Sequence, residues 1–269
     1  MGYAHIGVER RGDIGWLWLD RPDKLNALSA DMWEDLPKAV SDLTGDDSVR
    51  ALVVAGRGPA FTVGIDLEML AGLQPEGDSD AAANQELYRT IRRLQATMTA
   101  FAACPVPVIA AIHGYCLGAG VDLITACDIR LASADAVFSV RETRLAIVAD
   151  VGTLQRLPRI VGPGHVAELV YTGKDIDAAR AEKIGLVNEV HPTTEALHEA
   201  AQGLAEEIAA NSPLAVQGAK AVLAAGEAMT VEQALQHVAL WNSAFLRSND
   251  LTEAITAQIE RRRPKFTGT

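Results

Sequence analysis

The sequence lacks paired cysteines, an apolar leader and any long apolar run. Its cysteines are odd in number and show no C-x-x-C spacing: Cys104, Cys116 and Cys127. We therefore expect buried free thiols in a reducing compartment, without a disulfide framework or a zinc site. The N-terminal segment has no apolar signal core, and no run approaches the roughly 18 apolar residues of a membrane span. These absences predict a cytoplasmic protein with no membrane partner.

Positive charge is also scarce. The chain has 24 Lys and Arg residues against 35 Asp and Glu residues, for a net charge of −11. Such a surface repels polyphosphate at long range, so nucleic acid is not an expected partner. An anionic ligand must be held by a local feature, such as free backbone N–H groups or a few basic side chains. The basic run Arg261–Lys265 is the type of segment that is usually a solvated terminus, although it offers one place for phosphates.

The chain is 269 residues long and 49% apolar, which is enough for a sizeable core. Apolar runs bounded by charge, Gly or Pro predict strands at Ile14–Leu19, Ala51–Ala55, Val106–Ile112, Ile129–Ala132 and Val137–Val140. Apolar periodicity predicts helices at Ser29–Leu43, Asn84–Ala103 and Ala119–Cys127, with Ser29 as an N-cap. This mixture indicates an α/β domain in which helices cover the sheets.

The C-terminal part has a different composition. From Pro163 onward the sequence is Ala-rich with amphipathic spacing, and it contains one predicted strand around Leu186–Val190. Earlier in the chain, the Gly- and Pro-containing segment Gly72–Asp80 is typical of a mobile loop. We divide the chain into an α/β core over residues 1–200 and a helical region over residues 201–269.

The segment Phe61–Leu67 is the first candidate for chemistry, because it follows a predicted strand directly. Gly64 permits a backbone turn that leaves neighbouring N–H groups free. A plain turn is the ordinary alternative.

The second candidate is the Gly-rich bend within His113–Asp122, which leaves a strand and opens a helix. Unpaired amides at a helix start favour an anionic or carbonyl oxygen. Gly114, Gly118 and Gly120 also fit the G-x-x-x-G-x-G turn of short-chain dehydrogenases, so a nicotinamide enzyme is an alternative. Against it, the turn lies mid-chain and no Tyr-x-x-x-Lys pair exists.

Three carboxylates stand in largely apolar sequence: Asp122, Glu142 and Asp150. An acid in an apolar site finds donors or has its pKa raised, and a raised pKa suits proton transfer near neutral pH. Each also has a structural interpretation, because Asp122 and Asp150 could cap helices and Glu142 could pair with a neighbouring arginine. Other chemistries find less support: no histidines have metal-binding spacing, and no G-x-S-x-G motif occurs.

Four segments together resemble the crotonase (enoyl-CoA hydratase/isomerase) superfamily in order and spacing: Arg21–Ser29, Phe61–Leu67, Gly114–Leu123 and Cys127–Arg130. The resemblance implies a spiral of ββα units with a helical C-terminal trimerisation region. It also implies a CoA thioester as the ligand, no cofactor, and a homotrimer or a pair of trimers.

The resemblance assigns roles to particular residues. The backbone N–H groups of Val63 and Ala119 correspond to the family's oxyanion hole. The N-terminal motif around Lys24, Leu25 and Ala27 corresponds to the part that cradles the nucleotide of CoA. The neighbours of the oxyanion amides are expected to line the same acyl-CoA site: Ile65, Asp66 and Gly118.

The acids distinguish the branches of the superfamily. Asp122 and Glu142, 20 positions apart, occupy the places of the two hydratase glutamates, although the first is the shorter Asp. The stretch Arg141–Pro158 resembles the Δ3,5-Δ2,4-dienoyl-CoA isomerase branch, in which a third acid precedes V-G-T-L-Q-R-L-P, and Asp150 fills that position. We therefore expect a dienoyl-CoA isomerase, with enoyl-CoA hydration as the second hypothesis. A non-catalytic acyl-CoA-binding protein is the third.

Overall fold

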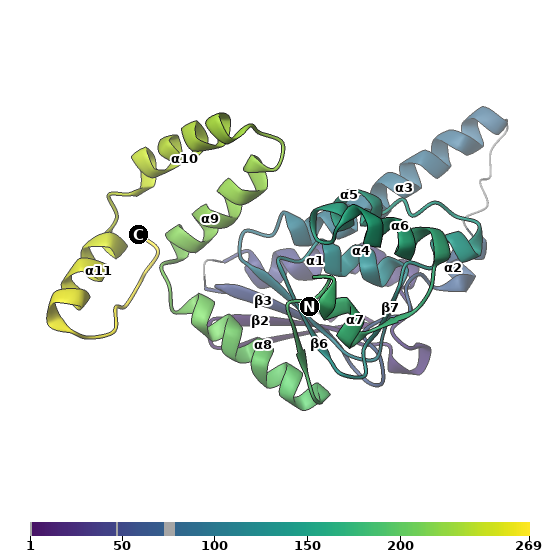
Figure 1. Cartoon of the computed structure of the whole chain (residues 1–269), viewed down its shortest axis with the longest axis horizontal. Helices are drawn as coiled ribbons and strands as arrows, with labels where there is room; N and C mark the ends of the chain where they lie inside the picture. The colour runs from purple at the N-terminus through teal and green to yellow at the C-terminus, as the bar shows by residue number, and fades with distance from the viewer. Residues whose placement is uncertain (1, 47, 73–78) are drawn as a thin grey trace.

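The computed structural model of the protein describes residues 2–46, 48–72 and 79–269 (Figure 1). The predicted loop Gly72–Asp80 falls largely outside these ranges. Gly72 ends helix α2 and Asp80 begins helix α3. None of the helices in the described part is long and apolar enough to cross a membrane.

Two sheets form the core of the fold. The larger has the strand order β1-β2-β3-β4-β6-β9, in which only the β1–β2 pair is antiparallel. Its strands are β1 (Ile6–Arg11), β2 (Ile14–Leu19), β3 (Ala51–Gly56), β4 (Val108–Ile112), β6 (Ile129–Ser133) and β9 (Glu189–His191). The smaller sheet has the order β5-β7-β8, with strands β5 (Tyr115–Leu117), β7 (Val137–Ser139) and β8 (Ile176–Asp177). The chain passes back and forth between the two sheets: β5 lies between β4 and β6 in sequence, and β7 and β8 lie between β6 and β9. Loops that follow strands of the larger sheet therefore contact strands of the smaller one.

Helices surround these sheets (Figure 1). The helices of the core are α1 (Ala30–Thr44), α2 (Leu67–Gly72), α3 (Asp80–Ala102), α4 (Ala119–Thr125), α5 (Thr153–Arg156), α6 (Pro163–Thr172), α7 (Ala178–Lys183) and α8 (Thr194–Ala209). Short 3₁₀ turns are η1 (Pro22–Lys24), η2 (Glu142–Leu145) and η3 (Leu157–Arg159). The last three helices are α9 (Pro213–Gly226), α10 (Val231–Phe245) and α11 (Asn249–Glu260).

The larger sheet is covered on both faces, which explains why strand β2 is buried along its whole length. Alternate residues of a strand point to opposite faces. Trp16 and Trp18 pack in the cluster beneath α8, while Leu17 and Leu19 join the main core with α1 and α3. A strand that is buried on both faces has a continuous apolar sequence, and this apolar run is the pattern that predicted β2.

The C-terminal helices extend away from the core (Figure 1). Apolar side chains on them are exposed, among them Leu223, Leu235, Leu240, Phe245 and Ile259. The predicted division at residue 200 falls inside α8, whose Ala201 and Ala205 pack against the larger sheet.

The expectation of an α/β core followed by a helical C-terminal part is confirmed. All five predicted strands of the core are present, and Ser29 is the residue that precedes α1, although its hydroxyl makes no capping hydrogen bond. Strand β4 begins two residues later than predicted because Pro107 contributes only its carbonyl, which accepts from Leu52 N–H. Strands β1, β5 and β8 were not predicted.

Candidate active site

Two loops that are distant in sequence meet beside the smaller sheet. Thr62 pairs with Cys116 in an isolated parallel bridge, and the N–H of Leu117 donates to the Thr62 carbonyl at 3.1 Å. Gly64 has φ +91°, and a Cβ there would lie 2.6 Å from the Leu117 carbonyl and 3.2 Å from the Ala119 nitrogen. Only glycine permits both this conformation and this approach. The turn at Gly64 therefore places Val63 next to Ala119.

The two expected oxyanion donors differ in their present partners. Ala119 is the first residue of α4, and its N–H has no hydrogen-bond acceptor within the described ranges. Val63 N–H donates to the carbonyl of Leu25 at 3.2 Å, which is at the long end for such a bond. The N–H of Ala119 is thus free to bind a ligand oxygen, whereas the N–H of Val63 already makes one long hydrogen bond.

Asp122 lies on the first turn of α4 and is fully buried. Its Oδ1 accepts from the backbone N–H of Thr153 at 2.5 Å, while its Oδ2 has no partner in the part of the chain that the structure describes. A short bond to one oxygen and none to the other leaves half of a buried carboxylate uncompensated. This is an arrangement that raises an acid's pKa.

Glu142 and Asp150 complete the group of acids. Glu142 is the first residue of η2. Its Oε1 lies 3.4 Å from the position that a Cβ on Gly118 would take, and Gly118 directly precedes Ala119 in the sequence. Its Oε2 is buried without a partner in the described structure. Asp150 is partly buried, and its backbone carbonyl accepts from Gln95 on α3 at 2.6 Å. The bond from Gln95 fixes the segment that carries the third acid.

Burial raises the pKa of all three acids, and Asp150 further raises the pKa values of Asp122 and Glu142. The pKa of Glu142 rises to about 7, first because of burial and then because of repulsion by Asp122 and Asp150. Burial raises the pKa of Asp122 to about 6, against the lowering effect of the Thr153 hydrogen bond. The pKa of Asp150 is raised by burial. Asp122 and Glu142 therefore form a coupled pair that titrates close to neutral pH, beside a third acid whose pKa is also raised.

The N-terminal motif is bound to the oxyanion loop by hydrogen bonds. Asn26, which sequence reasoning did not single out, is fully buried and donates from Nδ2 to the carbonyls of Arg57 and Ala60. Arg21 forms an ion pair with Asp66 at 2.5 Å, and this pair holds the pKa of Asp66 below its usual range. Asp66 is therefore a structural partner of the motif.

The expected CoA-binding residues lie together around this junction. Leu25 has φ +50°, and the N–H of Leu28 donates to the Gly64 carbonyl at 2.8 Å. Ala27 is buried and Lys24 is exposed, while Ile65 forms an isolated bridge with Leu28. The basic C-terminal run is partly committed elsewhere, because Arg262 pairs with Glu253 and Glu260.

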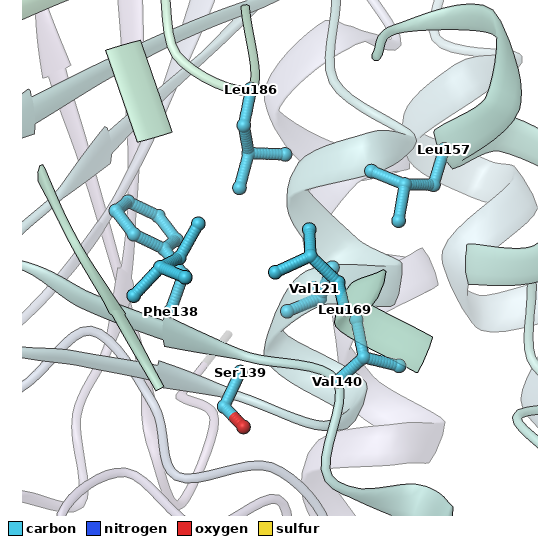
Figure 2. A pocket seen from close by; sticks show the side chains of 8 residues that line it. Val121, Phe138, Ser139, Val140, Leu157, Leu169 and Leu186 are labelled. Carbon is cyan, nitrogen blue, oxygen red and sulfur yellow. The ribbon is translucent and has the colours of Figure 1, made fainter. Parts of the chain in front are cut away.

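Two cavities among the described residues bear on the site. One of about 10 Å³ is enclosed by apolar side chains, among them Val121 of α4, Phe138 and Leu157 (Figure 2). It has room for about one water molecule and no polar lining beyond Ser139, so it is a packing gap. The other has a volume of about 1500 Å³, is open to solvent, and extends from Asp150 and Arg156 past α3 to α9. Asp150 is thus the acid that faces the larger space.

A model of the family described as enoyl-CoA hydratase/isomerase matches residues 9–269. The chain belongs to this family. The peroxisomal Δ(3,5)-Δ(2,4)-dienoyl-CoA isomerase of Arabidopsis thaliana is 47% identical over 93% of this chain and 91% of its own. The mitochondrial enzyme of the same name from Dictyostelium discoideum is 43% identical over 98% of this chain and 92% of its own. The crystal structure of an enoyl-CoA hydratase from Bacillus anthracis superposes with a TM-score of 0.90 at 32% identity, covering 98% of this chain and all of the other.

These comparisons confirm the predicted family, the crotonase fold and the expectation of an enzyme. The glycine-rich bend that also fits a dinucleotide turn belongs to this family, so the nicotinamide alternative loses its support. The roles of individual residues rest on the geometry of the two loops and the three acids.

Proposed function

We propose that the protein isomerises a 3,5-dienoyl-CoA to the 2,4-dienoyl-CoA. The observation that carries this proposal is the third acid: Asp150 lies close enough to Asp122 and Glu142 to raise their pKa values. A two-acid site suffices to add water, whereas moving a proton from C2 to C6 requires a proton donor farther along the acyl chain. The names of the two isomerase relatives support the same choice.

The proposed mechanism begins at the thioester carbonyl, whose oxygen would lie between the N–H groups of Val63 and Ala119. Glu142 removes a proton from C2, the C2–H electrons form a C1–C2 double bond, and the carbonyl π electrons move onto the oxygen, which gives a dienolate conjugated with the C3–C4 and C5–C6 double bonds. Each amide that receives this charge lowers the barrier by about 3 kcal/mol, the scale of one oxyanion donor.

In the second step of the proposed mechanism, a proton is added at C6. The dienolate collapses with the double bonds at C2–C3 and C4–C5, and C6 takes a proton from Asp150. Asp150 is partly buried in the free protein, and a bound acyl chain would exclude more water from it, which favours its protonated form. One proton is taken and one is given, so the reaction needs no metal, flavin or nicotinamide.

The test compares two thioesters with the purified protein. Supplied with a 3,5-dienoyl-CoA, the wild type should produce the ultraviolet absorbance of the conjugated 2,4-dienoyl thioester. Supplied with a 2-enoyl-CoA, it should consume the substrate far more slowly. The opposite preference would favour hydration by Asp122 and Glu142, which is the activity named for the Bacillus anthracis structure. Binding of CoA esters without turnover of either would favour a non-catalytic role.

We also propose a homotrimer, or a pair of trimers, assembled through the C-terminal helices. Exposed apolar side chains such as Leu240 and Ile259 on α10 and α11 are costly in a monomer and typical of an interface. Light scattering after size-exclusion chromatography measures the mass directly.

The cytoplasm is our proposed compartment, supported by three cysteines that are free and buried. The names of the two relatives place them in peroxisomes and mitochondria. Cell fractionation distinguishes the three locations.

A further inference from the structure

Arg156 is a partly buried arginine whose charge has no direct partner. Among the described residues, no carboxylate lies within salt-bridge distance of it, and its hydrogen bonds go to Thr99 Oγ1 at 3.1 Å and, weakly, to the Val151 carbonyl at 3.5 Å. The guanidinium also lines the cavity that is open to solvent, so water can meet its remaining donors. Its charge is not neutralised by an ion pair and can act through space on the acids nearby.

The side chain of Arg156 folds back over the turn that holds Asp122. Arg156 ends α5, and Thr153, the first residue of α5, donates its N–H to Asp122. Gly152, directly before Thr153, has φ +140°, and a Cβ there would collide with Nη1 of Arg156. Glycine at this position thus makes room for the guanidinium beside the backbone that holds the buried carboxylate.

The charged and titratable groups coupled to Asp122 come from four elements. Asp150, in the segment before α5, raises the pKa of Asp122, while Asp122 in turn raises the pKa values of Glu142 on η2 and of the buried thiol Cys116 on β5. Arg156, from α5, is the cation of this set, and it lowers the pKa of Asp122 against the effect of burial. Glu142, by contrast, has its pKa set by burial and by the two other acids.

We infer that Arg156 is a positioning residue that acts through Asp122: its positive charge keeps Asp122 ionised, and ionised Asp122 makes Glu142 a stronger base. The kinetic part of this inference rests on the proposed isomerase function. The charge state of Asp122 is a property of the free protein and does not depend on it.

The two acids are linked, so a change at Arg156 should appear at both. Without the cation, Asp122 holds its proton to higher pH. A neutral Asp122 no longer repels charge on Glu142, so the pKa of Glu142 falls and its carboxylate becomes a weaker base. A base weakened in this way removes the C2 proton more slowly even when it is fully ionised.

The experiment is an infrared titration of the carboxylic acid C=O band in the substrate-free protein. Asp122→Asn and Glu142→Gln assign the two components of the band. In Arg156→Gln the Asp122 midpoint should rise by about one pH unit and the Glu142 midpoint should fall. Arg156→Met, which keeps an apolar stem, should give the same shifts, and Arg156→Lys should restore the wild-type midpoints.

Arg159→Gln is the matched control. Arg159 lines the same large cavity but pairs with Glu227, so its loss should leave both midpoints where they are. In an Asp122→Asn background, Arg156→Gln should no longer move the Glu142 midpoint. Unchanged midpoints in folded Arg156→Gln and Arg156→Met, or an equal shift with Asn at position 122, would overturn the role of Arg156.

Kinetics separate this inference from the proposed function. With a 3,5-dienoyl-CoA, Arg156→Gln should lower the maximal kcat/KM about tenfold and move its acid limb downward. If the wild type turns over no dienoyl-CoA, the proposed function fails while the infrared titration still decides the role of Arg156. If turnover is present and the midpoints do not move, only the role of Arg156 fails.

Discussion

Replacing Glu142 by Gln should stabilise the protein at pH 8 while it removes the proposed base. A rise in pKa from 4.5 to about 7 corresponds to at most about 3.4 kcal/mol of lost stability above both values, at about 1.36 kcal/mol per pH unit. Because Glu142 is not fully buried and a Gln amide would lack a partner for its N–H, we expect a net gain of about 2 kcal/mol.

The sign of this effect follows from the protonated form. The fold favours protonated Glu142, so its penalty is absent well below pH 4.5 and develops as the pH rises through about 7. Urea denaturation at equal protomer concentration should therefore show wild type and Glu142→Gln equally stable near pH 4 and separated at pH 8. A variant that is less stable than wild type at pH 8, or a gap that does not change with pH, would refute the reasoning.

Glu253 provides a control of opposite sign. Its hydrogen bonds with Arg262 lower its pKa to about 2. Glu253→Gln should therefore lose stability at pH 8, and the loss should vanish only as the pH falls through the folded pKa. Opposite trends in the two variants would show that both report local electrostatics and not a general effect of removing negative charge.

Three further predictions concern activity. Asp150→Asn should lower kcat for the dienoyl-CoA about 10³-fold, the scale of a general acid, while enoyl-CoA binding measured by calorimetry is retained. Gly64→Ala should lower kcat about 100-fold, because the added Cβ separates the two oxyanion amides, whereas Gly203→Ala, where α8 leaves open space, should keep full activity. The wild-type kcat/KM should decline as the pH falls through about 7, where Glu142 gains its proton, in a pH–rate profile.

The parts of the fold that were predictable are those whose burial leaves a pattern. Strand β2 is apolar throughout because both of its faces are covered, and its predicted ends match the structure. Strand β1 was missed because it is an edge strand whose outer residues are charged and exposed. Strands β5 and β8 have three and two residues, too few for any periodicity to show.

In the candidate site, too, some features could be predicted from the sequence and others could not. Asp122 and Asp150 could be selected from the sequence because a carboxylate among apolar residues is unusual, whereas Glu142, which has arginine and threonine as neighbours, stood out by its place in the family pattern. What holds the acids could not be selected, because Thr153 contributes only a backbone N–H and Gln95 reaches Asp150 from a helix some fifty residues away. Contacts of this kind depend on which loops meet, and a backbone donor carries no signature in residue type.

The hydrogen bond from the Val63 N–H to the Leu25 carbonyl affects how well Val63 can bind a thioester oxygen. Its N–H already donates to the Leu25 carbonyl, and Leu25 belongs to the motif that is expected to cradle the nucleotide of CoA. An N–H shared between two acceptors gives less to each, so a thioester oxygen gains more from the free amide of Ala119 than from Val63 while Leu25 stays in place. Full use of both donors requires the Leu25 carbonyl to turn away. The loop that is expected to bind the nucleotide end of the substrate would therefore also control one half of the proposed oxyanion hole.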